Sequence, residues 1–219
     1  ALRDFKLSGA LLNDADKAEF LSLSTEASAL QAKFSENVLD ATNAFAYFAT
    51  LDELTGIPDE AIAAMRAAAQ ADDKDGYKIT LHFPSYFPVM QYAENRALRE
   101  RVYQAYVTRA SDANPVQPEF DNTRNMQSIL KAHQRLAALL GYDNYAQVSL
   151  GTKMAESVPQ VTEFLKHLAA KARTSALTDY SELQNFAREQ LGIEDMQAWD
   201  ATYTSEKLRQ ARYDFSEQE

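Results

Sequence analysis

The residues of this sequence best suited to bind a metal or move a proton are three histidines, His82, His133 and His167. A zinc hydrolase helix needs two histidines four residues apart with a glutamate between them, so that both rings share one face. No two of these histidines have that spacing. Glu163 and His167 are four residues apart, which fits either half of a metal site or a salt bridge on a helix surface. His82 falls on a predicted strand and His133 on a predicted helix, and neither has a second ligand nearby in the sequence.

Other patterns that carry chemistry are absent from the sequence. There is no G-x-S-x-G nucleophile elbow, no phosphate-binding glycine loop and no cysteine, so thiolate catalysis and cysteine-based metal sites are excluded. The charged stretch Asp72-Asp73-Lys74-Asp75 lacks the spaced ligands and terminal glutamate of a calcium loop, which favours a solvated turn. The sequence therefore assigns no catalytic and no metal-binding residue, and it leaves the substrate-binding residues unknown.

A group of aromatic residues is the remaining candidate for a binding site. These residues are predicted to lie on two consecutive helices, where they either line a groove for a peptide or form part of the core. The group consists of Tyr86, Phe87, Tyr92, Tyr103 and Tyr106.

Composition and charge exclude several classes of protein. The 219 residues are 46% apolar, which is too apolar for a disordered chain. With 22 basic and 32 acidic residues the formal charge is −10, which opposes binding to nucleic acids and to anionic membranes. The longest apolar run covers residues 44–49, far short of the roughly 20 that a membrane span needs. The lack of cysteine fits a reducing compartment, and we expect the protein to be cytoplasmic.

The rest of the sequence is patterned mainly for helices. Glycine and proline are few, apolar residues recur at intervals of three and four, and residues such as Asn13 or Asp14 can cap helix starts. The sequence Ser157–Gln160 has the form of a capping box, and Gly141 and Gly192 mark helix ends. Helices are predicted at residues 14–43, 58–70, 85–92, 94–111, 122–140, 143–150, 157–191 and 199–213.

Two short segments are predicted to be strands instead. Residues 44–50 and 77–83 are aromatic or β-branched, and the second alternates polar with apolar side chains. We expect them to pair with each other and to lie against helices, because an isolated pair of strands is only marginally stable. The predicted fold is thus mainly α, a helical bundle-like lobe over residues 1–219 with a small two-stranded insert.

Several stretches are too specific to be generic helix. They resemble, in the same order along the chain, segments of the oligopeptidase A and thimet oligopeptidase family of zinc metallopeptidases, and most closely those of its bacterial branch. The similar stretches are residues 34–42, 54–58, 84–90, 95–100, 106–111, 139–146 and 153–155, with Trp199-Asp200 and Ser205-Glu206-Lys207 near the end.

This resemblance implies a helical fold in which two lobes enclose a channel, where a zinc-bound water hydrolyses short peptides. The implied zinc ligands and catalytic glutamate belong to a His-Glu-x-x-His region that follows everything seen here. Because the sequence begins and ends inside family segments, we expect a fragment of the non-catalytic lobe. It would be inactive by itself, without zinc, and would pack against the missing catalytic lobe of the same chain.

Two positions depart from the family pattern. Thr204 stands where the family often has a second tyrosine after the Trp-Asp pair, and His133 stands where it usually has an arginine. The alternative to a peptidase fragment is a stand-alone helical module that binds a peptide or protein without catalysis. For a fragment, we also expect uncovered apolar area around Leu2, Phe5 and Leu7 or around Trp199, Leu208 and Phe215. Such area favours self-association that is a product of truncation.

Overall fold

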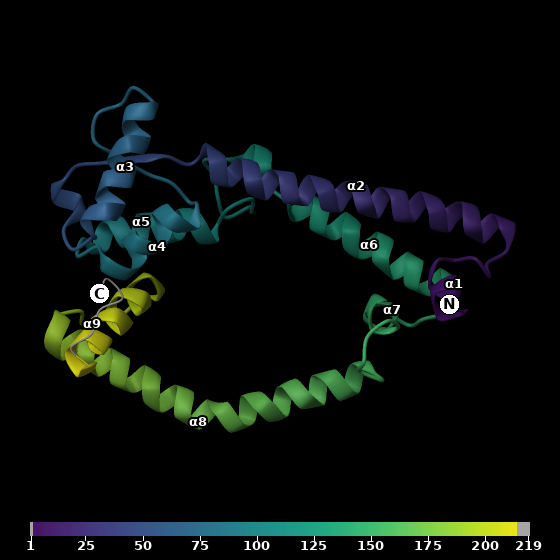
Figure 1. Ribbon diagram of the computed structural model, residues 1–219. Helices are drawn as coiled ribbons and strands as arrows, with labels where there is room; N and C mark the ends of the chain where they lie inside the picture. Colours follow the sequence, from purple (N-terminus) through teal and green to yellow (C-terminus); the bar gives the residue numbers. More distant parts are fainter. Residues whose placement is uncertain (1, 214–219) are drawn as a thin grey trace. The chain divides into compact units, whose positions relative to one another are not determined.

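The computed structural model describes residues 2–213 and shows a mostly helical protein (Figure 1). Over these residues the chain forms nine α-helices, three short 3-10 helices and one sheet of two strands. The predicted class, mainly α with a small two-stranded insert, is confirmed. The chain divides into two compact units, a first unit within residues 1–37 and 121–174 and a second within residues 38–120 and 175–219.

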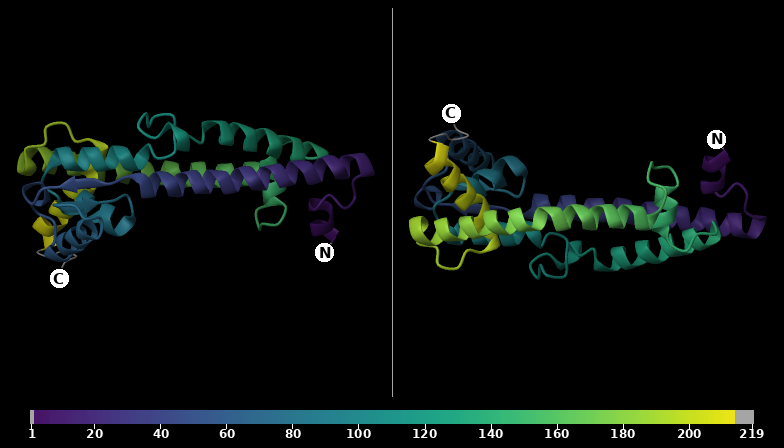
Figure 2. Two further views of the ribbon diagram at one scale, coloured as in Figure 1. Left: turned by 90° about the horizontal axis from the view of Figure 1, so that it is seen from above. Right: turned by 90° about the horizontal axis from the view of Figure 1, so that it is seen from below.

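The first unit is built on two long helices, α2 (Asp14–Ala44) and α6 (Thr123–Leu139), which lie side by side (Figures 1 and 2). The guanidinium of Arg135 donates two hydrogen bonds to the Glu19 carboxylate, from Nε at 2.6 Å and from Nη2 at 2.7 Å. Near the other end of this pair, the buried Asn37 amide donates to Oδ1 of Asn122 at 3.0 Å. The unit also contains α1 (Leu2–Leu7), α7 (Tyr145–Leu150) and the start of α8 (Val158–Leu191).

Helix boundaries in this unit follow local signals. Of the two proposed caps for α2, the structure selects Asn13, whose Oδ1 accepts a hydrogen bond from the Asp16 N–H at 2.9 Å. Ser157 caps α8 as predicted, since its hydroxyl accepts from the Gln160 N–H at 3.3 Å. The Gln160 side chain returns to the N–H of Glu156 at 2.7 Å and not to that of Ser157, so the reciprocal half of the capping box is displaced by one residue.

The second unit contains the sheet. Strands β1 (Tyr47–Ala49) and β2 (Tyr77–Ile79) are antiparallel, with Tyr47 opposite Ile79, and α3 (Asp59–Ala71) connects them. The predicted pairing across a helix is confirmed. Ile79 is fully buried and packs in a core with residues of α3, α4 (Phe83–Tyr92) and α5 (Arg96–Val107), including Val89 and Val102.

The predicted strand at 77–83 is longer than the real one, and the predicted helix at 85–92 is shorter. His82 is the residue before α4, and Phe83 and Pro84 open that helix. A proline in the first turn needs no N–H partner and has a φ already suited to helix, so Pro84 begins the helix where the sequence pattern suggested a break. Pro88 lies inside α4.

The chain ends, within the described residues, in a short 3-10 helix, η3 (Ala198–Asp200), followed by α9 (Ala201–Tyr213). Helix α8 runs to Leu191 as predicted, and Gly192 after it has a φ of +67°. Among the residues that the structure describes, no helix is both long and apolar enough to cross a membrane.

The expected uncovered apolar residues are found only in part. Leu2 and Phe5 are 78% and 61% exposed, as expected near the first helix. Of the residues named for the last helix, Trp199 and Leu208 are half-buried, so the exposed apolar side chains lie at the first of the two expected places. Helix η3 packs against α5, where Tyr103 and Arg96 contact the Trp199 ring, and α9 packs against α4. Phe215 lies outside the described residues.

Candidate functional site

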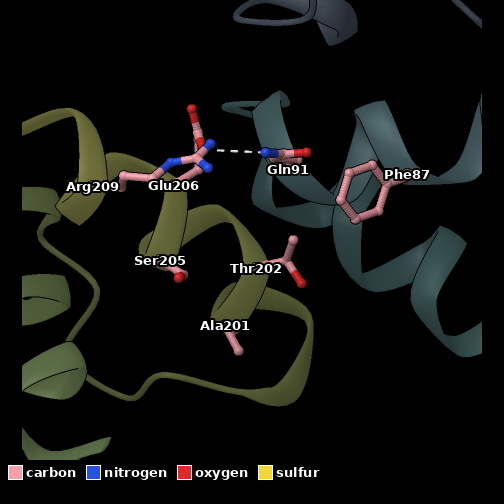
Figure 3. A pocket seen from close by; sticks show the side chains of 7 residues that line it. All are labelled: Phe87, Gln91, Ala201, Thr202, Ser205, Glu206 and Arg209. Atoms are coloured by element: carbon pink, nitrogen blue, oxygen red, sulfur yellow. Dashed lines mark hydrogen bonds and ion pairs between the residues drawn. The ribbon is translucent and has the colours of Figure 1, made fainter. Parts of the chain in front are cut away.

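A cavity of about 410 Å³ lies between α4 and α9 in the second unit (Figure 3). This volume is within the range of roughly 300–1,000 Å³ that small-ligand sites occupy. The cavity is lined by one aromatic ring and by small or polar side chains: Phe87, Gln91, Ala201, Thr202, Ser205, Glu206 and Arg209.

Helix periodicity places the polar side chains of α9 at this cavity. Thr202, Ser205, Glu206 and Arg209 follow one another at intervals of three, one and three residues, which puts them on one face of the helix. Figure 3 shows this face of α9 turned toward α4, which contributes Gln91. The cavity therefore has a polar wall made by one helix.

The carboxylate of Glu206 is the most deeply buried charge at the cavity, with 2% of the residue exposed. It accepts hydrogen bonds from the Gln91 amide at 3.1 Å, from the Gln210 amide at 2.7 Å and from the Arg209 guanidinium. Because a buried polar group is tolerated only when it is hydrogen-bonded, these three donors satisfy the Glu206 side chain and fix its position.

A second buried ion cluster holds the start of α9 in place. Asp200 is fully buried. Its carboxylate accepts a hydrogen bond from Nη2 of Arg99 at 2.8 Å and another from Nη2 of Arg96 at 2.8 Å. The N–H of Gln197 donates to the same carboxylate at 3.0 Å. Burial alone raises the pKa of Asp200, but the hydrogen bonds from Arg96, Gln197 and Arg99 outweigh it, and the pKa lies below its ordinary value of 3.8.

Arg99 links this cluster to α5 and to the connection before it. Its Nη1 donates to the carbonyl oxygen of Ala93 at 2.6 Å, and its guanidinium lies 4.1 Å from the centre of the Tyr203 ring. The cluster therefore ties α5 to η3 and α9, and so positions the polar face that lines the cavity.

The cavity suits binding by hydrogen bonds better than nucleophilic chemistry. The two hydroxyl groups that line the cavity, those of Thr202 and Ser205, share its lining with charged and amide side chains. None of the three histidines lines the cavity. A serine nucleophile needs an adjacent base to activate it. The donors, acceptors and single ring of the cavity can bind a polar, peptide-like group.

The structure keeps the three histidines apart. His82 donates from its ring to Oδ1 of Asn43 at 3.0 Å, and His133 accepts from the Gln31 amide at 3.1 Å. His167 and Glu163 are both exposed on α8. Across residues 2–213, no three His, Asp or Glu side chains are grouped so as to hold a metal ion. The donor groups in this part of the chain do not fit a zinc site, which needs three or four clustered ligands.

His133 joins α6 to α2 and α7, because its ring also stacks on Tyr145 with the ring centres 3.8 Å apart. Burial lowers the pKa of His133 below its ordinary value of 6.5, since it disfavours the charged ring. Protonation also removes the lone pair that accepts from Gln31.

We expect the first unit to lose stability as the pH falls below about 6.5, where the unfolded chain takes up a proton that the folded unit resists. The contribution is present in full above that pH. Thermal unfolding followed by circular dichroism at pH 7.5 and 5.5 measures it. The variant His133→Gln should depend less on pH over this range, whereas His167→Gln, at an exposed position, should behave like the wild type. Equal pH dependence in His133→Gln and wild type would refute this role of His133.

The five candidate aromatic residues divide between core and cavity. The rings of Tyr86 and Tyr106 stack with centres 4.0 Å apart, and burial raises the pKa of Tyr86 to about 12, as in a core. Tyr103 contacts Trp199, with ring centres 6.1 Å apart, and Tyr92 is buried. Of the five, Phe87 reaches the cavity (Figure 3).

A known protein family matches the part of the chain that forms most of this cavity. The model of the family described as peptidase family M3 matches residues 89–219, which is more than half of the chain. The chain belongs to peptidase family M3. The match begins in α4 and includes all of α9, so it covers every residue that lines the cavity except Phe87.

Curated relatives of this M3 chain match it along its whole length. Oligopeptidase A of Salmonella typhimurium and that of Escherichia coli are each 44% identical over 220 residues, covering 100% of this chain and 32% of the relative. A protein of Arabidopsis thaliana named "Probable cytosolic oligopeptidase A" is 41% identical over 228 residues, again covering 100% of this chain and 32% of the relative. The chain thus spans about a third of the length of these relatives. The resemblance found in the sequence is confirmed.

Sequence reasoning missed most of the cavity of this M3 chain. Gln91, Thr202 and Arg209 were not singled out, and Glu206 was noted only as part of a family-like stretch. The signal that was available is the polar recurrence along 202–209 at helical spacing. Thr204, which departs from the family pattern, is fully buried, and its hydroxyl has no hydrogen-bond partner in the described part of the chain.

Proposed function

We propose that this chain is a non-catalytic helical lobe of a zinc-dependent oligopeptidase that hydrolyses short peptides in a channel between two lobes. The observation that carries the proposal is the identity of 44% with oligopeptidase A over the whole of this chain. The chain spans 32% of those relatives, which leaves room for a catalytic lobe elsewhere in a longer polypeptide. In this proposal zinc belongs to the whole enzyme, and the residues of this chain form one wall of the channel.

The partners that we propose for the whole enzyme are short peptides. The partner that we propose for this chain is the catalytic lobe of the same polypeptide. The name of the M3 relatives supports peptides as the substrate class. A net charge of −10 supports the absence of nucleic acid and anionic membrane partners. We also propose a cytoplasmic location, which the name of the plant relative supports.

A second candidate is a stand-alone helical module that binds a peptide without cleaving it. The cavity between α4 and α9 favours this reading, because its polar face and its one aromatic ring can hold a peptide segment by themselves. The two candidates differ in the polypeptide that contains this sequence. A reading frame that continues into a His-Glu-x-x-His helix would establish the first and eliminate the second.

The 219-residue chain should bind zinc only weakly and should not cleave peptides, because the residues described offer no set of three clustered ligands. Titration with zinc by calorimetry measures the first property, and a fluorescence-quenched peptide assay measures the second. The longer polypeptide, assayed with the same peptides before and after chelation of zinc, is the positive control. A sub-micromolar zinc site on the 219-residue chain, or zinc-dependent cleavage by it, would contradict the proposed division of roles.

A further inference from the structure

Two hydroxyl groups face the cavity between α4 and α9 instead of their own helix. Thr202 and Ser205 line the cavity, and neither hydroxyl donates to another residue that the structure describes. Other helical hydroxyls in this chain behave differently: those of Thr25, Thr42 and Ser181 each donate to the carbonyl oxygen four residues earlier. The hydroxyls of Thr202 and Ser205 are therefore available to a molecule that enters the cavity.

The spacing of these two hydroxyls suits the backbone of an extended peptide. Thr202 and Ser205 are three residues apart on α9, so their Cβ atoms are neighbours at roughly 5–6 Å. Each hydroxyl can donate one hydrogen bond and accept others. A residue of an extended chain presents its N–H and its C=O on the same edge, as in an antiparallel ladder. One hydroxyl can accept from that N–H while the other donates to that C=O.

The opposite wall of the cavity is aromatic. The ring of Phe87, on α4, lines the cavity across from the α9 hydroxyls (Figure 3). It stacks on the ring of Phe83 one turn earlier, with the ring centres 4.9 Å apart and the planes inclined by 20°. Phe83 is 61% exposed, so this ring pair offers apolar area to a ligand. An apolar side chain that leaves water to pack on it gains free energy.

The charges of the cavity favour an uncharged ligand. Its lining contains one carboxylate, of Glu206, and one guanidinium, of Arg209, and these two groups form an ion pair with each other. Their opposite charges cancel. An ammonium or carboxylate group that entered the cavity would lose its hydration and would have to disrupt this pair to gain a counter-charge. The internal part of a peptide, which carries neither terminus, avoids that cost.

We propose that the cavity between α4 and α9 binds an uncharged internal segment of a peptide. Thr202 and Ser205 hold the backbone of one extended residue, and the rings of Phe87 and Phe83 pack on an apolar side chain of the segment. This inference rests on the proposed function, in which peptides are the substrates. It goes beyond that function by naming the residues that bind the peptide and the part of the peptide that they recognise.

A short blocked peptide tests the proposal. The probe is an N-acetylated and C-amidated pentapeptide of glycine with phenylalanine at its centre, and its affinity is measured by NMR titration. The titration is performed on the 219-residue chain and on the longer polypeptide that contains it, after chelation of zinc to prevent cleavage. The variants are Thr202→Val, which keeps the shape of the side chain, and Ser205→Ala. The control is Ser175→Ala, which removes an exposed hydroxyl from α8, away from the cavity.

We expect Thr202→Val and Ser205→Ala each to weaken binding of the probe about two- to tenfold, which corresponds to the loss of one hydrogen bond. Ser175→Ala should bind like the wild type. The same pentapeptide with free termini should bind no more tightly than the blocked one. The proposal would be overturned by unsaturable binding to the wild type, by equal affinities in the cavity variants and the wild type, or by binding that requires a free terminus.

Peptidase kinetics of the longer polypeptide, measured with zinc present, separate this inference from the proposed function. The cavity variants should raise KM rather than lower kcat, because binding that is equal in the ground and transition states acts on KM. Zinc-dependent cleavage that both variants leave unchanged would keep the proposed function and reject the peptide site. Binding that depends on the two hydroxyls, without any cleavage, would support the peptide site and reject the proposed function.

Discussion

Replacing Asp200 with alanine should destabilise the second unit by about 3–5 kcal/mol, because it leaves the charge of Arg99 buried without a counter-charge. Arg99 is 1% exposed and Asp200 is fully buried, so water cannot replace the lost partner. The change also removes the carboxylate that accepts the N–H of Gln197 at the start of η3. Urea unfolding followed by circular dichroism measures the loss.

The matched control is an ion pair on the surface. Arg188 and Glu189 lie 3.9 Å apart with both side chains largely exposed, so Arg188→Ala should change stability by less than about 1 kcal/mol. The variant Asp200→Asn keeps the shape of the side chain but loses its charge. If Asp200→Ala were no more harmful than Arg188→Ala, the buried cluster would not be what holds α9 in place.

The acid side of the stability curve gives an independent check on the same cluster. The pKa of Asp200 is lowered in the folded state, so its contribution is present above the ordinary value of 3.8 and is lost as the pH falls toward the folded value. The wild type should therefore lose more stability than Asp200→Asn on acidification below about pH 4.

Replacing Gly56 with alanine should destabilise the second unit by about 3 kcal/mol or more, for two reasons that add. Gly56 has a φ of +89°, a conformation that residues with a side chain rarely adopt. A Cβ placed there would lie 2.4 Å from the backbone carbonyl oxygen of Tyr92, which cannot move like the end of a flexible side chain. Thermal and urea unfolding of the variant measure the effect.

Gly192→Ala in the same unit separates these two reasons. Gly192 has a φ of +67°, but a Cβ at this position meets no atom within 4 Å. Its replacement should therefore cost only the backbone strain, about 1 kcal/mol. Comparable losses in the two variants would show that the close contact between a Cβ at position 56 and the Tyr92 carbonyl oxygen, at the end of α4, adds nothing to the destabilisation.

The sequence by itself determined the helical class, the paired strands and the family. Each of these depends on signals within a few residues. Asn13 caps a helix through a hydrogen bond to Asp16, and Gly192 ends one through its own φ. The strand at 77–83 was predicted too long because Pro84 can open a helix as well as end a strand, and local pattern does not distinguish these.

The tertiary structure alone decided the candidate site and the uncovered surface. Arg99 and Asp200 are 101 residues apart in the sequence, and Gln91 and Glu206 are 115 apart, so no local pattern could pair them. Phe164 and Leu168 are four residues apart, which places them on one face of the helix, but this spacing could not predict whether a partner covers that face. Burial is a property of the surrounding elements, and here the structure leaves both side chains exposed.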